Sequence, residues 1–567
     1  MMKKITLEAG KSYTIKAKIN KIDKKKSLMK ETHGAALRYC SSNTKIAKVS
    51  SKGMIQYISI EILHLNAYNN IGFRGLIMRN TGEASMRSKV IGRNEEWQRL
   101  EECVRADTAQ LIIVYGRRRV GKTFLVNEFF DNEFTFKITG AYNKPKDYQL
   151  RNFMAEYNRR TGEQRDTPGD WVQAFECLRE YLSKCSCNGN YAGKKIVFFD
   201  ELPWLDTMKS GFLDAFEWFW NDWASARNEV VFIVCGSVTS WMITNLNENK
   251  GGLFNRQTCR LYLEPFTLAE TEKYLNYKDI YWSHYEVAET YMIMGGIPYY
   301  LNLLRAGLSY SQNIDHIFFR KNGELWDEFE HLYKTLFTNS DSYIRVVQAL
   351  SEKAGGLSRN ELAGKTGLPA NGDLTQIINN LMSSGFVRVS GFYKKKKKDA
   401  LYQLADYYSA FYFRYLQNNY GKDEHYWSNA IDNPARRAWT GLTFEQLCKD
   451  HISQIKRKLG ISGVLTEESV WYTKGDGNLG IGGAQIDLVL ERRDRVINLC
   501  EMKFSINEYV IDKDYDAVLR NKLETFRRMT NCRQSLQMTM ITTYGVKKNK
   551  YSNFVQSEVT LDDLFHE

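Results

Sequence analysis

The sequence has no long apolar run and no cluster of metal ligands. These absences argue against a membrane-spanning protein and against a zinc-stabilised one. No apolar run reaches the ~18 residues that a membrane span requires. The first residues, MMKKITLEAGKSYT, lack the apolar stretch of a secretory signal. The 10 cysteines include no CxxC pair and the 8 histidines form no ligand cluster, which argues against a structural zinc site. We therefore expect a cytoplasmic protein with free thiols and no membrane partner.

The length and charge of the chain predict several domains and allow a polyanionic partner. With 567 residues the chain is too long for one hydrophobic core. The formal net charge is +13 and the pI is about 9.0, values that admit DNA as a partner without establishing it.

Residues 1–60 alternate apolar and polar residues, as half-buried strands do. The alternation is clear in KITLEAGKSYTIKAKI and in YCSSNTKIAKVSSKGMIQ. The stretch SSNTKIAKVSSKGMI resembles the closing strands of the group 2 bacterial immunoglobulin-like domain, which implies a partial all-β segment of that type. Residues 61–89 have no clear period and are expected to be a linker. We also hypothesise that the native chain begins at Met86.

From Val90 onward, apolar strands alternate with helical stretches. Strands are expected in QLIIVYG, KKIVFFDE and VVFIVCGS. Such alternation is typical of a parallel sheet with helices on both faces. Residues 90–270 are therefore predicted to be one α/β core, and residues 271–340 to be mainly helical.

Residues 341–405 have the order of a winged helix-turn-helix, with three helices followed by the strands FVRVS and ALYQL. Ser358 and Glu361 have capping-box spacing at the second helix. The run Lys394–Lys398 lies between the two strands, where each phosphate contact would release counterions. A solvated lysine loop, or a winged helix packed against its neighbours, is the alternative to DNA contact. The third helix should expose polar side chains suited to base edges or phosphates: Asn371, Thr375, Gln376 and Asn379.

The run LIIVYGRRRVGKTFLVNEFF carries the P-loop pattern GxxxxGK[ST] between an expected strand and an expected helix. Its backbone N–H groups would wrap the β-phosphate, and the helix N-terminus would add its positive end. Lys122 would reach the β- and γ-phosphates, and Thr123 would ligate Mg²⁺. The predicted nucleotide-binding residues of this run are Gly116, Arg117, Arg118, Arg119, Val120, Gly121, Lys122, Thr123 and Phe124.

Later strand ends supply candidate catalytic side chains. Asp200 could hold the magnesium shell, and Glu201 beside it could orient the attacking water. Ser237 could sense the γ-phosphate, although a turn serine fits equally well. Arg256 is the candidate arginine finger, with Arg260 as its competitor and a plain surface arginine as the alternative. A finger that acts on a neighbour's nucleotide would require a homo-oligomer.

Residues 90 to about 340 resemble the archaeal-type ATPase family of the AAA+/STAND P-loop class. The matching stretches are VIGRNEE, GRRRVGKT, FFDELPWL, FIVCGSVTSWM, GGLFNR, LEPFTLAE and GGIPYYL. The resemblance implies ATP and Mg²⁺ as cofactors and places Ile91, Gly92 and Arg93 beside the adenine. It also implies that the helical segment that follows the core, with Pro298, forms a lid behind the nucleotide.

Residues 406–435 are expected to be a helical connector, and residues 436–567 a final α/β domain. Its stretch IDLVLERRDRVINLCEMKF predicts two strands, with Asp487 on the first and Glu501 and Lys503 on the second. Glu501 and Lys503 share one face, because side chains alternate along a strand. That face also carries apolar residues, which argues against a hairpin with a wet face.

Glu445, in the predicted helix TGLTFEQLCKDHISQI, could add a further oxygen to this face. The combined set resembles the PD-(D/E)XK nuclease superfamily, with Ile486 standing where the motif has proline. This resemblance implies Mg²⁺ at Asp487 and Glu501 and a lysine near the attacked phosphate. Whether such a site cuts DNA stays open.

The sequence thus predicts a multidomain α/β protein. It would contain a P-loop NTPase parallel sheet with a helical lid, a winged helix, a C-terminal α/β nuclease-like domain and a short all-β N-terminal segment. The leading interpretation is a Mg²⁺-dependent ATPase whose nucleotide state controls a DNA-binding winged helix and the nuclease-like domain. The alternative is a slow-turnover, nucleotide-gated switch with a catalytically inactive C-terminal binding domain.

Overall fold

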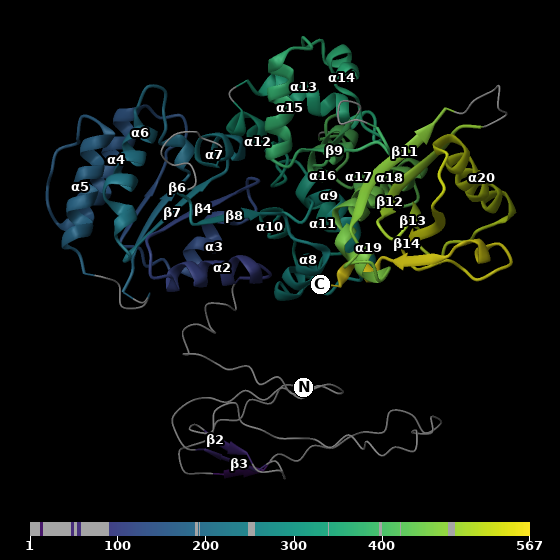
Figure 1. Cartoon of the computed structure of the whole chain (residues 1–567), viewed down its shortest axis with the longest axis horizontal. Coiled ribbons are helices and arrows are strands. Elements are labelled where there is room, and N and C mark those ends of the chain that lie inside the picture. The colour runs from purple at the N-terminus through teal and green to yellow at the C-terminus, as the bar shows by residue number, and fades with distance from the viewer. Residues whose placement is uncertain are drawn as a thin grey trace. The chain divides into compact units, whose positions relative to one another are not determined.

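The chain divides into two units, Met1–Lys89 and Val90–Glu567 (Figure 1). The computed structural model describes residues 90–186, 191, 193–247, 256–337, 339–395, 400–419, 421–474 and 482–566, together with three strands of the first unit. Those strands pair antiparallel in the order β1-β3-β2 and are β1 (Ser12–Thr14), β2 (Ala47–Val49) and β3 (Met54–Tyr57). The expected β pattern appears there, and the immunoglobulin-like assignment stays a prediction.

A five-stranded parallel sheet in the order β5-β6-β7-β4-β8 forms the core of the second unit, as the alternating pattern predicts. Every residue of β6 and β7 is buried, because helices cover both faces of the sheet. The strands are β4 (Gln110–Gly116), β5 (Phe136–Thr139), β6 (Lys195–Asp200), β7 (Val230–Gly236) and β8 (Cys259–Leu263). The helices are α2 (Asn94–Arg105), α3 (Lys122–Phe129), α4 (Lys146–Thr161), α5 (Trp171–Lys184), α6 (Phe212–Asp222) and α7 (Thr239–Met242).

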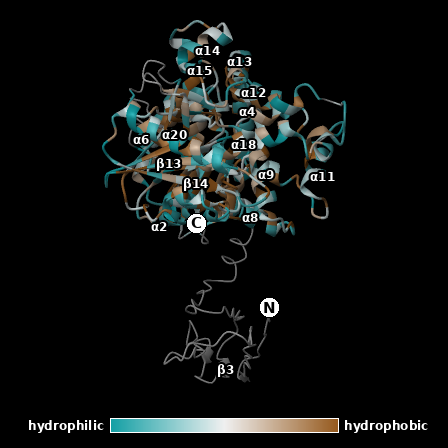
Figure 2. Cartoon of the chain, turned by 90° about the vertical axis from the view of Figure 1, so that its right-hand side faces the viewer, coloured by the Kyte–Doolittle hydropathy of each residue, from teal (hydrophilic) through white to brown (hydrophobic). Residues whose placement is uncertain are grey.

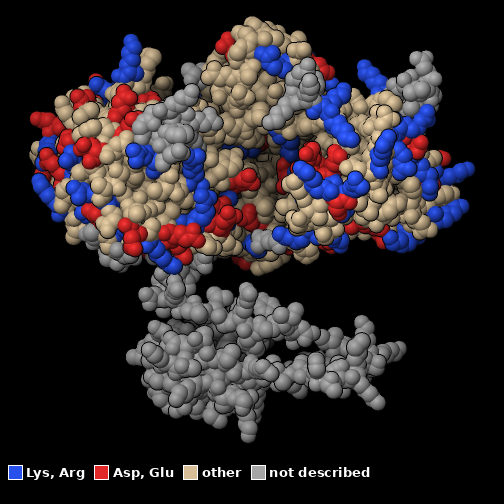
Figure 3. Space-filling view, in the orientation of Figure 1, with Lys and Arg blue, Asp and Glu red and all other residues tan. Residues whose placement is uncertain are grey.

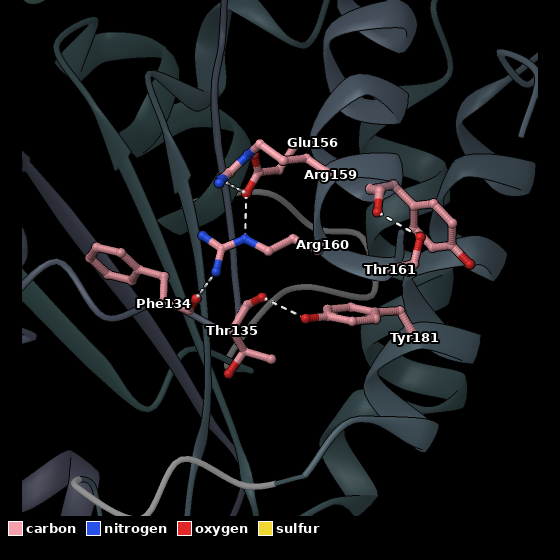
Figure 4. Close-up of polar contacts among 8 residues, drawn as sticks. Phe134, Thr135, Glu156, Arg159, Arg160, Thr161 and Tyr181 are labelled. Carbon is pink, nitrogen blue, oxygen red and sulfur yellow. Dashed lines mark hydrogen bonds and ion pairs between the residues drawn. The ribbon is translucent and has the colours of Figure 1, made fainter. Parts of the chain in front are cut away.

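Polar contacts fasten two of these helices to the start of β5 (Figure 4). Arg160 of α4 donates to the carbonyl oxygen of Phe134 over 2.8 Å and pairs with Glu156 over 2.7 Å. Tyr181 of α5 donates to the carbonyl oxygen of Thr135 over 3.2 Å. Hydrophobic segments concentrate in the interior of the unit, and hydrophilic ones along its outer helices and turns (Figure 2).

A helical segment follows the sheet, as expected. Three of its helices begin with capping boxes, at Thr267, Ser283 and Ser309. In each box the side chain of the capping residue accepts from the backbone N–H three residues later, and the side chain of that later residue accepts from the N–H of the capping residue. Its helices are α8 (Leu268–Tyr277), α9 (His284–Met294), α10 (Pro298–Leu301), α11 (Tyr310–Ile314) and α12 (Glu328–Leu336).

Three helices and a strand pair come next, in the order that the sequence predicts. Strands β9 and β10 pair antiparallel. The capping box of Ser358 and Glu361 is confirmed at the start of the second helix. These elements are α13 (Ser340–Ser351), α14 (Arg359–Thr366), α15 (Gly372–Ser383), β9 (Val387–Ser390) and β10 (Leu401–Leu404). Their identification as a winged helix stays a prediction.

A second five-stranded sheet, in the order β11-β12-β13-β14-β15, follows a run of connecting helices. Strands β11, β12 and β13 pair antiparallel, whereas β13, β14 and β15 pair parallel, with α20 as the crossover between β13 and β14. The strands are β11 (Thr466–Thr473), β12 (Ala484–Arg492), β13 (Val496–Lys503), β14 (Ser535–Thr542) and β15 (Ser557–Thr560). The helices are α16 (Tyr407–Phe411), α17 (Tyr426–Asn429), α18 (Pro434–Asp450), α19 (Ile452–Lys458) and α20 (Lys513–Thr530).

Among the residues that the structure describes, no helix combines the length and apolar character that a membrane crossing needs.

Candidate functional site

The P-loop joins β4 to α3 at the carboxyl edge of the parallel sheet. Gly116 has a φ of 141°, and a Cβ there would lie 2.4 Å from the carbonyl oxygen of Leu263, so only glycine fits. Gly121 has a φ of 91° and precedes the first residue of α3. The two motif glycines therefore stand where the backbone needs them, and the first backbone N–H groups of α3 are directed toward the loop.

Lys122 lies inside the loop rather than in solvent. Its side chain is 5% exposed, and its ammonium donates to the carbonyl oxygens of Gly116 (3.0 Å) and Arg117 (2.8 Å). Burial lowers the pKa of Lys122 below its ordinary value. The predicted phosphate-binding lysine is thus held among the backbone groups that would surround a phosphate.

The two predicted magnesium ligands of the ATPase core meet each other. The Thr123 hydroxyl lies 3.0 Å from both carboxylate oxygens of Asp200, which ends β6. Burial, together with the nearby Glu201, raises the pKa of Asp200. A hydroxyl and a carboxylate side by side are hard oxygen donors of the kind that Mg²⁺ prefers. Because Mg²⁺ takes its other ligands from phosphates and water, this donor set fits the ion.

Glu201 and Ser237 also meet, at the ends of β6 and β7. The Glu201 carboxylate accepts hydrogen bonds from the Ser237 backbone N–H (3.1 Å) and from the Ser237 hydroxyl. Glu201 has a φ of 48°, in the left-handed region, so the chain turns sharply where the strand ends. The predicted water-orienting carboxylate and the predicted γ-phosphate sensor therefore form one hydrogen-bonded pair.

Arg93 contacts both the P-loop and the segment that follows β8. Its guanidinium donates to the carbonyl oxygens of Val120 (3.2 Å) and Glu264 (2.7 Å) and lies 4.9 Å from the centre of the Phe266 ring. The Phe266 N–H in turn donates to the carbonyl oxygen of Gly296 over 2.8 Å. Arg93 therefore braces the P-loop against the start of the helical segment. The adenine-bordering role of Ile91, Gly92 and Arg93 stays a prediction.

The other predicted residues of the core lie around the loop. Pro298 is the first residue of α10, and the side chain of Phe124 is 49% exposed on α3. Arg256 is exposed just before β8, and Arg260 on β8 donates to Gln257 over 2.7 Å. The finger role of either arginine stays a prediction.

In the C-terminal sheet, Asp487 and Glu501 are buried on adjacent strands, β12 and β13. The Glu501 carboxylate receives three donors: the ammonium groups of Lys503 (2.9 Å) and Lys522 (2.6 Å) and the Tyr515 hydroxyl (2.9 Å). Burial would raise the pKa of Glu501, but the two lysines outweigh it and lower the pKa. Burial and Glu501 raise the pKa of Asp487.

Glu445 of α18 faces the same site. Burial, with Asp487 as the next cause, raises the pKa of Glu445 to about 7. Glu445 also lines a cavity of about 250 Å³ between α18 and the strand pair β9–β10, together with Lys449, Arg388 and Gln403. The four residues predicted from the nuclease resemblance thus lie in one neighbourhood. No group of three or more His, Cys, Asp or Glu side chains suited to a metal ion occurs in the described part of the chain.

Sequence reasoning missed the partners that α20 contributes to this site. Tyr515 and Lys522 lie seven residues apart, two helical turns, and so share the face that reaches Glu501. That periodicity is visible in the sequence, but nothing in it indicates which face docks on β13.

A family model matches the P-loop part of the chain, and one relative matches most of its length. A family model described as an ATPase domain predominantly from Archaea matches residues 91–304. The uncharacterized protein MJECL04 of Methanocaldococcus jannaschii is 23% identical over 443 residues, covering 76% of this chain and 90% of that protein. The uncharacterized ATP-binding protein MJ0423 of the same organism is 49% identical over 43 residues, covering 8% of this chain and 73% of that protein.

Two solved structures are also similar, at low sequence identity. The Walker-type ATPase PABY2304 of Pyrococcus abyssi has 17% identity and a TM-score of 0.40, covering 58% of this chain and 97% of its own. The Aeropyrum pernix ORC2 protein in its ADPNP–ADP complexes has 14% identity and a TM-score of 0.38, covering 58% and 93%. The family match agrees with the P-loop, Asp200 and Glu201 geometry described above. Through residues 91–304, the chain belongs to the family of ATPase domains found predominantly in Archaea.

Proposed function

We propose that the protein is a Mg²⁺-dependent ATP hydrolase whose nucleotide state controls a DNA-binding winged helix (residues 341–405) and the nuclease-like C-terminal domain. The observation that carries the proposal is the hydrogen-bonded set at the sheet edge, where Thr123 contacts Asp200 and Ser237 contacts Glu201. These four side chains lie at the same edge of the sheet as the buried Lys122, where the P-loop would hold the nucleotide phosphates.

Hydrolysis would proceed by in-line attack of water on the γ-phosphate. Lys122 would neutralise charge on the β- and γ-phosphates, and Glu201 would orient and polarise the water. Thr123 and Asp200 would hold Mg²⁺, which supplies further neutralisation of the phosphate charge when it is bound. Ser237, now a donor to Glu201, would position that carboxylate for the water.

Steady-state phosphate release tests the ATPase assignment. Lys122→Ala and Glu201→Gln should each lower turnover by about 100-fold or more, because each removes a group that acts on the transferred phosphoryl or its water. Lys146→Ala is the control: this half-buried lysine at the start of α4 donates to the Gly169 carbonyl oxygen over 3.1 Å. Wild-type turnover in Lys122→Ala and Glu201→Gln would contradict the assignment.

DNA contact is proposed from the wing and from the basic surface of the C-terminal domain. The residues directly after β9 bond to β11 of that domain. The Tyr393 N–H donates to the Val470 carbonyl oxygen, and the Val470 N–H donates to the Gly391 carbonyl oxygen, both over 3.0 Å. Lysines and arginines are frequent on the right-hand side of Figure 3, where Figure 1 places the second sheet and α20. Exposed basic residues of this domain include Arg493, Arg495, Arg527, Arg528 and Arg533. Basic side chains spread over adjoining elements suit a phosphate backbone.

The predicted recognition face on α15 is solvent-exposed at Asn371, Thr375, Gln376 and Asn379. Two of these residues already have partners: Asn371 caps α15, and Thr375 accepts from Arg359 over 3.1 Å. Helix α15 also contacts α7 of the ATPase core. This contact supports communication with the nucleotide site and favours phosphate contacts by the wing over deep insertion of α15.

A second candidate function is a slow nucleotide-gated switch whose C-terminal domain binds without cutting. The three donors on Glu501 favour it, since an acid held by two lysines and a tyrosine has fewer free oxygens for a metal. Incubation with plasmid, Mg²⁺ and ATP separates the two candidates. Cleavage that is lost in Asp487→Asn and Lys503→Ala supports the nuclease, and no cleavage under any condition supports the switch.

A further inference from the structure

The arginines of the P-loop extend away from the loop toward elements far along the chain. Arg117 forms an ion pair with Asp406, the residue that precedes α16. The Arg119 guanidinium lies 2.7 Å from the carboxylate of Glu328, the first residue of α12. The nucleotide-binding motif is therefore anchored at two acidic residues outside the ATPase sheet.

The pair of Arg117 and Asp406 is buried, and Asp406 has further hydrogen-bond partners. The two side chains are 5% and 1% exposed, and the guanidinium lies 5.0 Å from the centre of the Phe386 ring, one residue before β9. The Asp406 carboxylate also accepts from the Ser409 N–H (3.0 Å) and hydroxyl (2.6 Å). A buried charge is stable only while its partner is in place, so the position of Asp406 fixes that of Arg117.

The pair of Arg119 and Glu328 is fixed in a similar way. The Arg119 guanidinium lies 4.1 Å from the centre of the Tyr299 ring, and Glu328 accepts from the Tyr300 hydroxyl over 2.9 Å. Burial raises the pKa of Glu328 above its ordinary value, although Arg119 acts in the opposite direction. Helices α10 and α12 thus hold one side chain of the loop between them.

These anchors reach the reacting groups through the loop itself. The Arg117 carbonyl oxygen accepts a hydrogen bond of 2.8 Å from the Lys122 ammonium, so a continuous chain of contacts runs from Asp406 through Arg117 to Lys122. Arg119 has a φ of 73°, in the left-handed region that a non-glycine residue holds only when its surroundings enforce it. Displacing a catalytic group by about 1 Å can cost about 100-fold in rate.

We propose that Glu328 and Asp406 are positioning residues of the ATPase site, which hold the P-loop through Arg119 and Arg117 and connect the nucleotide to the strand pair β9–β10. This inference rests on the proposed ATPase function, because it presumes that Lys122 acts on bound phosphates. Nothing in the motif GxxxxGK[ST] requires arginines at these places, so phosphate binding by the motif does not by itself account for the two ion pairs.

The test compares Glu328→Gln and Asp406→Asn with matched exposed controls, Asp327→Asn and Asp432→Asn. We expect both site variants to lower ATP turnover by about 10-fold or more, and both controls to stay within about twofold of wild type. The double variant Arg119→Gln with Glu328→Gln should be no slower than the slower single variant, because contacting partners are not additive. Turnover within twofold of wild type in both site variants, or effects that simply multiply, would overturn the proposal.

Hydrogen exchange on the wild-type chain keeps the test decisive if a variant fails to fold. A bound, non-hydrolysable ATP analogue should change the exchange rates of amides in residues 405–411 and in α12 by about fivefold or more, a coupling of about 1 kcal/mol. Unchanged exchange there, with nucleotide bound, would overturn the proposal. Failure of the wild-type chain to bind a fluorescent ATP analogue would instead remove the proposed ATPase function.

Discussion

Glu501 on β13 accepts a hydrogen bond of 2.6 Å from Lys522 on α20, a residue that lies 21 positions further along the chain. This contact brings helix α20 onto the strand that carries the candidate C-terminal site. It also surrounds Glu501 with positive charge, which keeps the carboxylate ionised. The lysine therefore does for Glu501 what a bound cation would do.

Lys522→Ala should destabilise the C-terminal sheet by about 3 kcal/mol, because it leaves a buried carboxylate with one ammonium partner fewer. Hydrogen exchange of the β13 amides measures this local stability. Arg520→Ala is the control on the same helix, since Arg520 is exposed and its ion pair with the half-buried Asp516 should contribute less than about 1 kcal/mol. Equal effects of the two substitutions would show that Lys522 does not hold Glu501.

The pH dependence of stability should reveal Glu445. The pKa of Glu445 is raised from 4.5 to about 7 in the folded protein. Between these values the folded state keeps a proton that the unfolded chain has released, so this group makes stability fall as the pH rises. Glu445→Gln has no carboxyl group to titrate, so it lacks this loss of stability. The free energy of unfolding of the variant, relative to that of wild type, should therefore increase from pH 4.5 to pH 7. Urea unfolding of both chains measures it, and a constant difference across this range would contradict the prediction.

Thr123→Ala should lower ATP turnover by about 10-fold or more and raise the Mg²⁺ concentration that gives half-maximal rate. Thr123→Ser is the matched control, because it keeps the hydroxyl that lies 3.0 Å from Asp200. Magnesium titration of phosphate release separates weakened metal binding from a loss of fold. An unchanged magnesium requirement in Thr123→Ala would exclude this hydroxyl as a ligand.

The ATPase site could be predicted from the sequence, because its residues lie in short motifs at the ends of predicted strands. The P-loop from Gly116 to Thr123 sits between a strand and a helix, and Asp200 ends a buried strand. Parallel strands bring such ends to one edge of a sheet, so the meeting of Thr123 and Asp200 follows from the pattern alone.

Other relationships could not be predicted, because tertiary packing decides them. The pairs of Arg117 with Asp406 and of Glu501 with Lys522 join elements whose docking no local pattern specifies. The run of three arginines in the P-loop could be read from the sequence as nucleotide contacts, yet two of its side chains point to acidic partners elsewhere. The alternation of side chains along a strand correctly placed Glu501 and Lys503 on one face. It could not show that these two residues pair with each other.

Lysines of the wing should contribute to DNA affinity through phosphate contacts. Lys394 and Lys395 are described, and Lys396–Lys398 of the predicted run lie outside the described residues. Replacing Lys394 and Lys395 with Gln should reduce the slope of log affinity against log salt by about 1 per lost contact. Fluorescence anisotropy on one duplex at several salt concentrations measures the slope. Lys334→Gln, whose ammonium pairs with Glu330 over 2.7 Å, is the control.

The most direct test of the central claim is the DNA dissociation constant of the whole chain, measured with a non-hydrolysable ATP analogue, with ADP and without nucleotide. If nucleotide state controls the winged helix and the nuclease-like domain, the constants should differ by about fivefold or more between the ATP analogue and ADP. Glu201→Gln, given ATP, should then match the ATP-analogue value. Equal constants in all three conditions, from protein that hydrolyses ATP, would contradict the account.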